Sequence, residues 1–119
     1  MTLLEAEGLA DLGMWQEAWE ALEAIPAEER AVPRSLRVRL RCCPALGAWE
    51  IGKHVAGVLR DGDPADRATA ANFYHQQAVL LAKQQQSNGA KEAVAAAVQT
   101  WPDCRITVLD DPALSDLFR

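Results

Sequence analysis

Three arginines of the sequence are spaced so that a helix would carry them on a single face. Arg34, Arg37 and Arg41 follow one another at i, i+3 and i+7, and residues at these intervals are neighbours on a helix surface. A guanidinium group binds a carboxylate through two parallel hydrogen bonds. The row therefore predicts a surface for an acidic segment or a C-terminal carboxylate of a partner. The alternatives are a solvated face, or pairing with the acidic N-terminal part of the same chain.

Other side chains are expected to extend this surface. Gln76, Lys83 and Gln86 lie within one long predicted helix and would add polar contacts. Trp101 stands at a predicted helix end beside Pro102, where it would be exposed and could anchor a partner. Together these side chains predict a binding surface rather than a reaction centre.

The remaining tryptophans and histidines favour a structural role. Trp15, Trp19 and Trp49 follow helical spacing together with apolar residues, so we expect them in the core. His54 and His75 have no second histidine at metal-binding spacing. The sequence contains no nucleophile elbow, phosphate-binding loop or dinucleotide fingerprint. It therefore predicts no enzyme, no cofactor and no metal.

The cysteines indicate the expected compartment. Their number is odd, and Cys42 and Cys43 are adjacent, so reduced thiols are the simplest interpretation. We expect Cys43 in the core and Cys42 partly exposed. The N-terminal residues lack the basic region of a signal peptide, and no apolar run approaches the roughly 18 residues that span a bilayer. A cytoplasmic protein is therefore predicted.

Composition favours an all-α fold. Of the 119 residues, 22 are alanine, the strongest helix former, whereas aromatic residues make up only 6%. The net charge of −5 should repel nucleic acid and anionic membranes at long range. Its distribution is uneven: residues 1–32 hold eight acidic residues and one basic residue, and residues 33–60 hold six basic residues and one acidic residue. The basic middle could attract an acidic partner locally.

Apolar periodicity and turn residues place the helices. We expect helices ending before Gly13, Pro26 and Pro44, and an N-cap at Asp63 followed by Pro64. Ser87-Asn88-Gly89 is expected to be a turn. The predicted helices are residues 4–12, 15–25, 33–43, 46–59, 65–86, 90–101 and 113–118, with one loose turn at 27–30.

An internal repeat connects these helices. Equivalent residues 34 positions apart are Gly13 and Gly47, Trp15 and Trp49, and Ala18 and Gly52. A period of 34 is that of helix–turn–helix repeats, and a third copy is expected to start its turn at Gly89. One such pair of helices cannot bury its apolar face alone, so the copies are expected to stack.

On these residues the chain resembles the tetratricopeptide-repeat (TPR) family, which places a glycine, an aromatic and a small residue at this spacing. The resemblance implies a right-handed α-solenoid of about three TPR hairpins with a C-terminal capping helix. The hairpins would span residues 1–32, 33–62 and 63–102, followed by a capping tail at 103–119. The resemblance also implies that Arg34, Arg37 and Arg41 line the concave groove, where the family binds peptides.

The resemblance implies a protein–protein interaction module, an adaptor for a partner protein. Similarity to short bacterial members, such as the bacterial kinesin light chain, makes a bacterial tubulin filament a candidate partner. Two alternatives stay open. A self-assembling scaffold would stack the acidic first hairpin of one chain on the basic middle of the next. A chaperone-like protein would bind an export or assembly client in the same groove.

Overall fold

The computed structural model describes residues 2–118, and this part of the chain is helical without strands. The α-helices are α1 (Leu3–Asp11), α2 (Trp15–Glu23), α3 (Ala27–Arg30), α4 (Pro33–Leu46), α5 (Trp49–Leu59), α6 (Pro64–Lys83), α7 (Ser87–Thr100) and α8 (Arg105–Leu109). Two short 3-10 helices are η1 (Pro102–Cys104) and η2 (Ser115–Phe118). The predicted all-α class is confirmed. Among the described helices, none combines the length and apolar character needed to cross a membrane.

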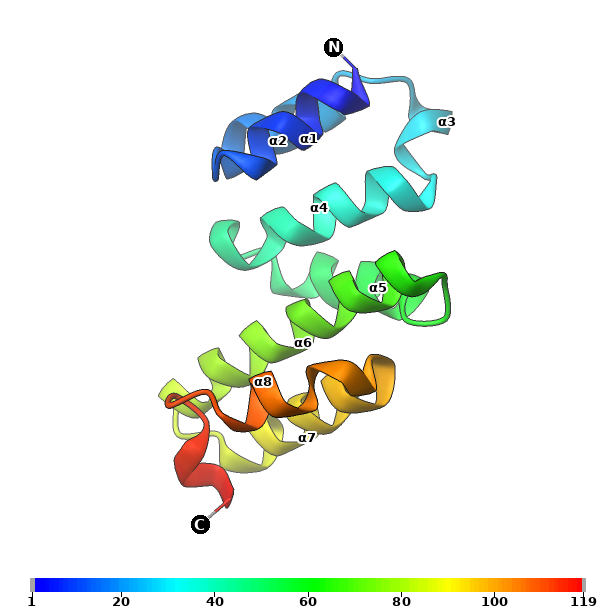
Figure 1. Ribbon diagram of the computed structural model, residues 1–119. Coiled ribbons are helices and arrows are strands. Elements are labelled where there is room, and N and C mark those ends of the chain that lie inside the picture. Colours follow the sequence, from blue (N-terminus) through cyan, green and yellow to red (C-terminus); the bar gives the residue numbers. More distant parts are fainter. Residues whose placement is uncertain (1, 119) are drawn as a thin grey trace.

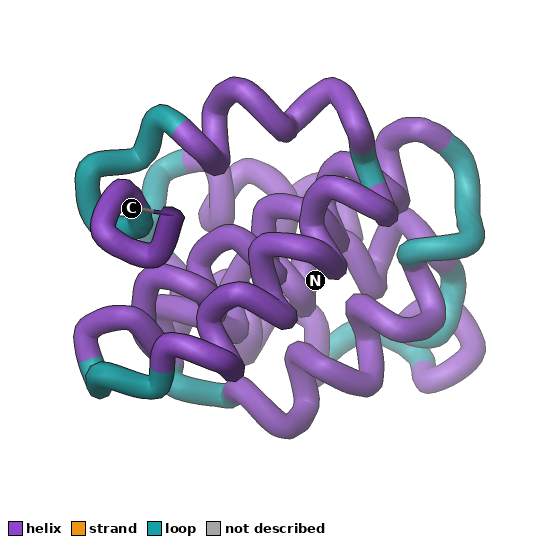
Figure 2. Tube along the Cα trace, turned by 90° about the horizontal axis from the view of Figure 1, so that it is seen from below, coloured by secondary structure: helices purple, strands orange, loops and turns teal. Residues whose placement is uncertain are grey.

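Helices pack in consecutive pairs, and the pairs stack along one axis (Figure 1). The first pair is α1 with α2, the second is α4 with α5, and the third is α6 with α7. Neighbouring pairs meet where α1 and α2 contact α4, and where α4 and α5 contact α6. The molecule measures 48 × 26 × 22 Å, and the two chain ends lie far apart along the stack. Viewed along the stack, the loops lie toward the sides and the helices cross between them (Figure 2).

Two apolar clusters form the core. The smaller lies among α1, α2 and α4 and contains Leu22 and Val38. The larger extends from α4 to the C-terminal segment and contains Leu59, Phe73 and Leu114. Alanines fill much of both clusters, which lets the helices approach closely. Burial of each large side chain contributes about 2 kcal/mol.

One turn motif ends the first helix of all three pairs. Gly13 and Gly47 have positive φ angles of 75° and 69°, and Gln85 has a φ of 60° at the corresponding place after α6. In each turn the next N–H donates to the carbonyl five residues earlier at 2.9 Å, which is the Schellman arrangement. The turns are 34 and 38 residues apart, so the third copy is longer by about one helical turn. Gly89, the predicted third turn residue, instead lies inside α7.

The prediction that Pro44 breaks a helix is wrong. α4 continues through Pro44 to Leu46. Proline removes one N–H but keeps a helical φ angle, and the Schellman bonds of the following turn hold the last turn closed. The N–H of Gly47 donates to the carbonyl of Pro44 at 3.4 Å, and that of Ala48 donates to the carbonyl of Cys43 at 2.9 Å.

Other boundaries also differ from the prediction, among them the start of α5, which lies at Trp49 rather than at residue 46. α7 begins at Ser87, so residues 87–89 form its first turn, and α6 ends at Lys83 rather than at Gln86. The predicted C-terminal helix at 113–118 is the shorter 3-10 helix η2, whereas α8 lies in a segment where no helix was predicted. The predicted N-cap at Asp63 is present: its carboxylate accepts the Asp66 N–H at 3.0 Å, and the Asp66 side chain completes a capping box.

α5 packs tightly against the Phe73 side chain of α6 at Gly52. A Cβ atom at this position would lie 2.4 Å from Cε2 of Phe73, so the site requires glycine. The Phe73 ring also contacts Trp49, with their centroids 5.6 Å apart. This contact fixes the position of the Trp49 ring.

The prediction for Cys42 is also wrong, because Cys42 is fully buried together with Cys43. α4 lies between the first and third pairs and is therefore covered on two sides. Burial raises the pKa of Cys43 to about 11 and also raises that of Cys42. Both thiols therefore stay protonated at neutral pH.

Candidate functional site

The predicted arginine row lies on α4, and its guanidinium groups bind carboxylates of the same chain. Arg34 donates to both carboxylate oxygens of Glu7, at 2.9 and 2.6 Å. Arg41 donates to Asp11 at 2.8 Å. Both acidic residues belong to α1, so these two arginines make the pairing with the acidic N-terminal part that the sequence left as an alternative.

Arg37 makes a different contact. Its guanidinium binds the carboxylate of Asp66 in the first turn of α6. Asp66 is only 4% exposed, and its second oxygen accepts the N–H of Asp63 at 3.2 Å. Arg37 therefore connects the second helical pair to the third. Its charge is directed into the fold rather than toward a partner.

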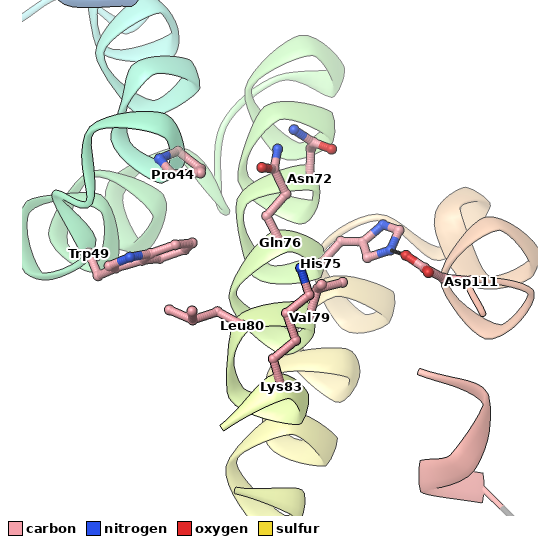
Figure 3. A pocket seen from close by; sticks show the side chains of 9 residues that line it. All are labelled: Pro44, Trp49, Asn72, His75, Gln76, Val79, Leu80, Lys83 and Asp111. Carbon is pink, nitrogen blue, oxygen red and sulfur yellow. Dashed lines mark hydrogen bonds and ion pairs between the residues drawn. The ribbon is translucent and has the colours of Figure 1, made fainter. Parts of the chain in front are cut away.

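A groove crosses the surface formed by α4, α6 and the C-terminal segment. It consists of three adjoining hollows that share Asn72 of α6. The central hollow, of about 360 Å³, lies between Pro44 and Trp49 on one side and Asp111 on the other (Figure 3). A hollow of about 240 Å³ continues past Arg41 toward the start of α2, and one of about 300 Å³ continues toward α8.

One polar face of α6 forms the floor of the groove. Asn72, Gln76 and Lys83 line the central hollow together with the aliphatic side chains of Val79 and Leu80 (Figure 3). The predicted contributions of Gln76 and Lys83 thus fall in one hollow. Gln86 lies in the turn beyond α6, and its amide donates to Gln84 at 3.2 Å. Of the arginine row, Arg41 lines the adjoining hollow.

His75 and Asp111 are hydrogen-bonded to each other at one side of the groove. His75 Nε2 lies 2.7 Å from Asp111 Oδ2, and both residues line the central hollow (Figure 3). The pKa of Asp111 is lowered because its carboxylate accepts the Ala113 N–H, with further contributions from His75 and Lys83. The pair fastens the C-terminal segment to α6 and fixes one wall of the groove.

Sequence reasoning missed Asn72 and His75 as members of the site. His75 looked isolated because its partner lies 36 residues further along the chain. A usable signal existed in the spacing of Asn72, His75 and Gln76, since residues at i, i+3 and i+4 share a helix face. Three polar side chains on one face of this helix could have marked this surface.

The tryptophans are all partly buried. Trp19 packs against both core clusters, and the Arg39 guanidinium lies 4.5 Å from its ring centroid. Trp101, predicted as an exposed anchor, packs against the larger cluster. The Arg67 guanidinium lies 5.1 Å from the Trp101 ring, and Trp101 lines the hollow toward α8. A partner could touch only part of this ring.

The groove is suited to binding. Its polar groups are amides, one ammonium group, one guanidinium and the His75–Asp111 pair, with the Asp103 carboxylate and the Thr107 hydroxyl in the hollow toward α8. Cys104 lines the hollow toward α8, and burial raises the pKa of its thiol, which keeps it protonated. Within residues 2–118 there is no group of three or more metal-ligating side chains. Compared with family models, curated proteins and solved structures, the chain matches none of them.

Proposed function

We propose that the chain is a TPR-type solenoid and acts as an adaptor that binds an extended segment of a partner protein. The observation that carries this proposal is the continuity of the groove, whose three hollows meet at Asn72 and cross two stacked helical pairs. The repeated turns at Gly13, Gly47 and Gln85 support the solenoid. A groove that crosses stacked helices offers a continuous path for an extended chain.

The lining indicates what such a segment would contain. The amides of Asn72 and Gln76 can each donate to a peptide carbonyl and accept from a peptide N–H. Trp49, with neighbouring aliphatic groups, would cover an apolar side chain. Lys83 and Arg41 add positive charge, although Arg41 shares its charge with Asp11. The expected segment therefore carries an apolar residue and at least one acidic residue.

The ion pairs of α4 bear on the scaffold alternative. Head-to-tail stacking by charge requires a basic middle that is free to contact the acidic hairpin of another chain. Arg34 and Arg41 already bind that hairpin within their own chain. We therefore place the adaptor first. A chaperone-like protein would use the same groove but accept many unfolded clients.

A bacterial tubulin filament is the named candidate among adaptor partners. Cosedimentation of the chain with polymerised bacterial tubulin at low salt tests it, because a charge-assisted contact is strongest there. We expect the chain in the pellet. A chain that stays entirely in the supernatant would remove this candidate without affecting the groove.

The adaptor proposal is tested by affinity capture from lysate of the source cell. The groove variant combines Gln76→Glu with Lys83→Glu, which reverses the charge of the floor at exposed positions. The matched control combines Gln99→Glu with Lys91→Glu on the exposed side of α7. We expect the wild type and the control to retain the same protein and the groove variant to lose it. Equal retention by both variants would contradict the proposal.

A further inference from the structure

A second surface, separate from the groove, lies on the outer side of α1. Leu4 and Gly8 of α1 and its C-cap residue Leu12 follow at i, i+4 and i+8 and share this side. Leu4 is 71% and Leu12 is 77% exposed, and a Cβ atom at Gly8 would meet nothing within 4 Å. We call these three residues the α1 face. Their alignment along one helix is the pattern of a helix-packing surface.

The corresponding side of α4 shows what such a surface accommodates. α4 is the first helix of the second pair, and α1 and α2 of the preceding pair cover it. α1 is the first helix of the first pair, and no described helix covers its outer side. The α1 face therefore has the position and the apolar character of a surface that receives another helix.

Acidic residues border the α1 face on both edges. Glu5 and the exposed carboxylate of Asp11 lie beside the apolar residues. Every charged residue before Arg30 is acidic: Glu5, Glu7, Asp11, Glu17, Glu20, Glu23, Glu28 and Glu29. Arginines of the chain bind only three of them among the described ion pairs, which are Glu7, Asp11 and Glu23. This end of the molecule therefore carries unbalanced negative charge around an apolar strip.

We propose that the α1 face docks a basic amphipathic helix of a partner protein. The apolar side of that helix packs against Leu4 and Leu12, and its backbone passes over Gly8, where no side chain keeps it away. Its lysines or arginines face Glu5 and the neighbouring acidic residues. A second copy of the chain fits poorly, because two α1 faces would bring acidic edges together. The proposal does not depend on the groove.

The probe is a synthetic peptide of leucine and lysine, roughly 18 residues long, with its leucines at helical spacing. Binding to the full chain is measured by fluorescence anisotropy at low and high salt. The test variant combines Leu4→Gln with Leu12→Gln. The matched control combines Ile51→Gln with Val58→Gln, which are 45% and 63% exposed on α5. Neither pair of substitutions changes the net charge. Circular dichroism verifies that both variants fold.

We expect the wild type and the α5 control to bind the peptide equally and the α1 variant to bind at least about tenfold more weakly. A peptide of the same composition in scrambled order should bind as weakly to the wild type as the ordered peptide binds to the α1 variant. Equal binding of ordered and scrambled peptides, or equal weakening in both variants, would mean nonspecific charge attraction and overturn the proposal. So would a dimer of the wild type that the α1 variant loses, since a second copy would then occupy the face.

Discussion

Arg37 of α4 and Asp66 of α6 form an ion pair that connects the second helical pair to the third. The Asp66 carboxylate is nearly inaccessible and also closes the capping box at the start of α6. Arg37, which the sequence predicts as part of a binding surface, thus stabilises the packing of the helical pairs instead. The groove beside it depends on this contact, because α4 contributes to one side of the groove and α6 forms its floor.

Removal of Arg37 should destabilise the fold strongly. Arg37→Leu leaves the buried Asp66 carboxylate without its cation, so we expect the free energy of unfolding to fall by about 3 kcal/mol. Arg34→Leu is the matched control, because its pair with Glu7 is solvent-exposed and should contribute much less. Urea unfolding measures both. Equal losses in the two variants would contradict the assignment.

Replacing each of two glycines of α5 by alanine should change the stability of the fold in opposite directions. Gly52→Ala places a methyl group against the buried Phe73 ring, and we expect a loss of about 2 kcal/mol. Gly57→Ala meets nothing within 4 Å and should gain about 0.5–1 kcal/mol from helix propensity. Thermal unfolding of both variants measures the difference. A Gly52→Ala variant as stable as Gly57→Ala would show that α5 and α6 are not this close.

Gln85 is a position where glycine should stabilise the chain. Its φ angle of 60° costs a residue with a Cβ atom roughly 1 kcal/mol. Gln85→Gly should therefore raise the free energy of unfolding by up to about 1 kcal/mol, whereas Gly47→Gln should lower it by a similar amount. Chemical denaturation of the two variants provides the test. A loss of stability in Gln85→Gly would argue against the third turn as described.

The Asp111 carboxylate should contribute to the free energy of unfolding, and this contribution should be lost at acid pH. The folded-state pKa of Asp111 lies below its ordinary value of 3.8, because the Ala113 N–H and His75 favour the charged form. The contribution is therefore present above that value and is lost as the pH falls through the folded-state pKa. Urea unfolding of the wild type and Asp111→Asn between pH 7 and about 2.5 measures this effect. We expect the stability difference to shrink toward acid pH; a constant difference would contradict it.

Local signals predicted most helices and the turn at Gly13. The turn at Gly47 was indicated by the 34-residue repeat, whereas the local pattern placed Gly47 inside a helix at 46–59. Gly13 and Gly47 end helices because glycine adopts positive φ without strain. The third turn could not be found in this way, because Gln85 adopts the same conformation without being glycine. The turn was therefore assigned to the next glycine, Gly89. The prediction that Pro44 ends a helix was wrong because the adjacent Schellman turn supplies hydrogen bonds that keep α4 helical beyond Pro44.

The candidate site was predicted in part. Gln76 and Lys83, predicted to add polar contacts to the groove from one long helix, both line the central hollow. The partners of Arg37 and His75 lie 29 and 36 residues away along the chain. Such pairs depend on how the helical pairs stack, which helical periodicity does not specify. Charge spacing therefore located the arginines but could not show that their carboxylates belong to the same molecule.

Site-specific photo-crosslinking in the source cell tests the central claim most directly. A benzophenone amino acid replaces Gln76 on the floor of the groove, and in a second version it replaces Gln99 on the exposed side of α7. We expect a discrete crosslinked partner from position 76 that is absent from position 99. No product at position 76, or the same products from both positions, would contradict the assignment of this groove as the binding site.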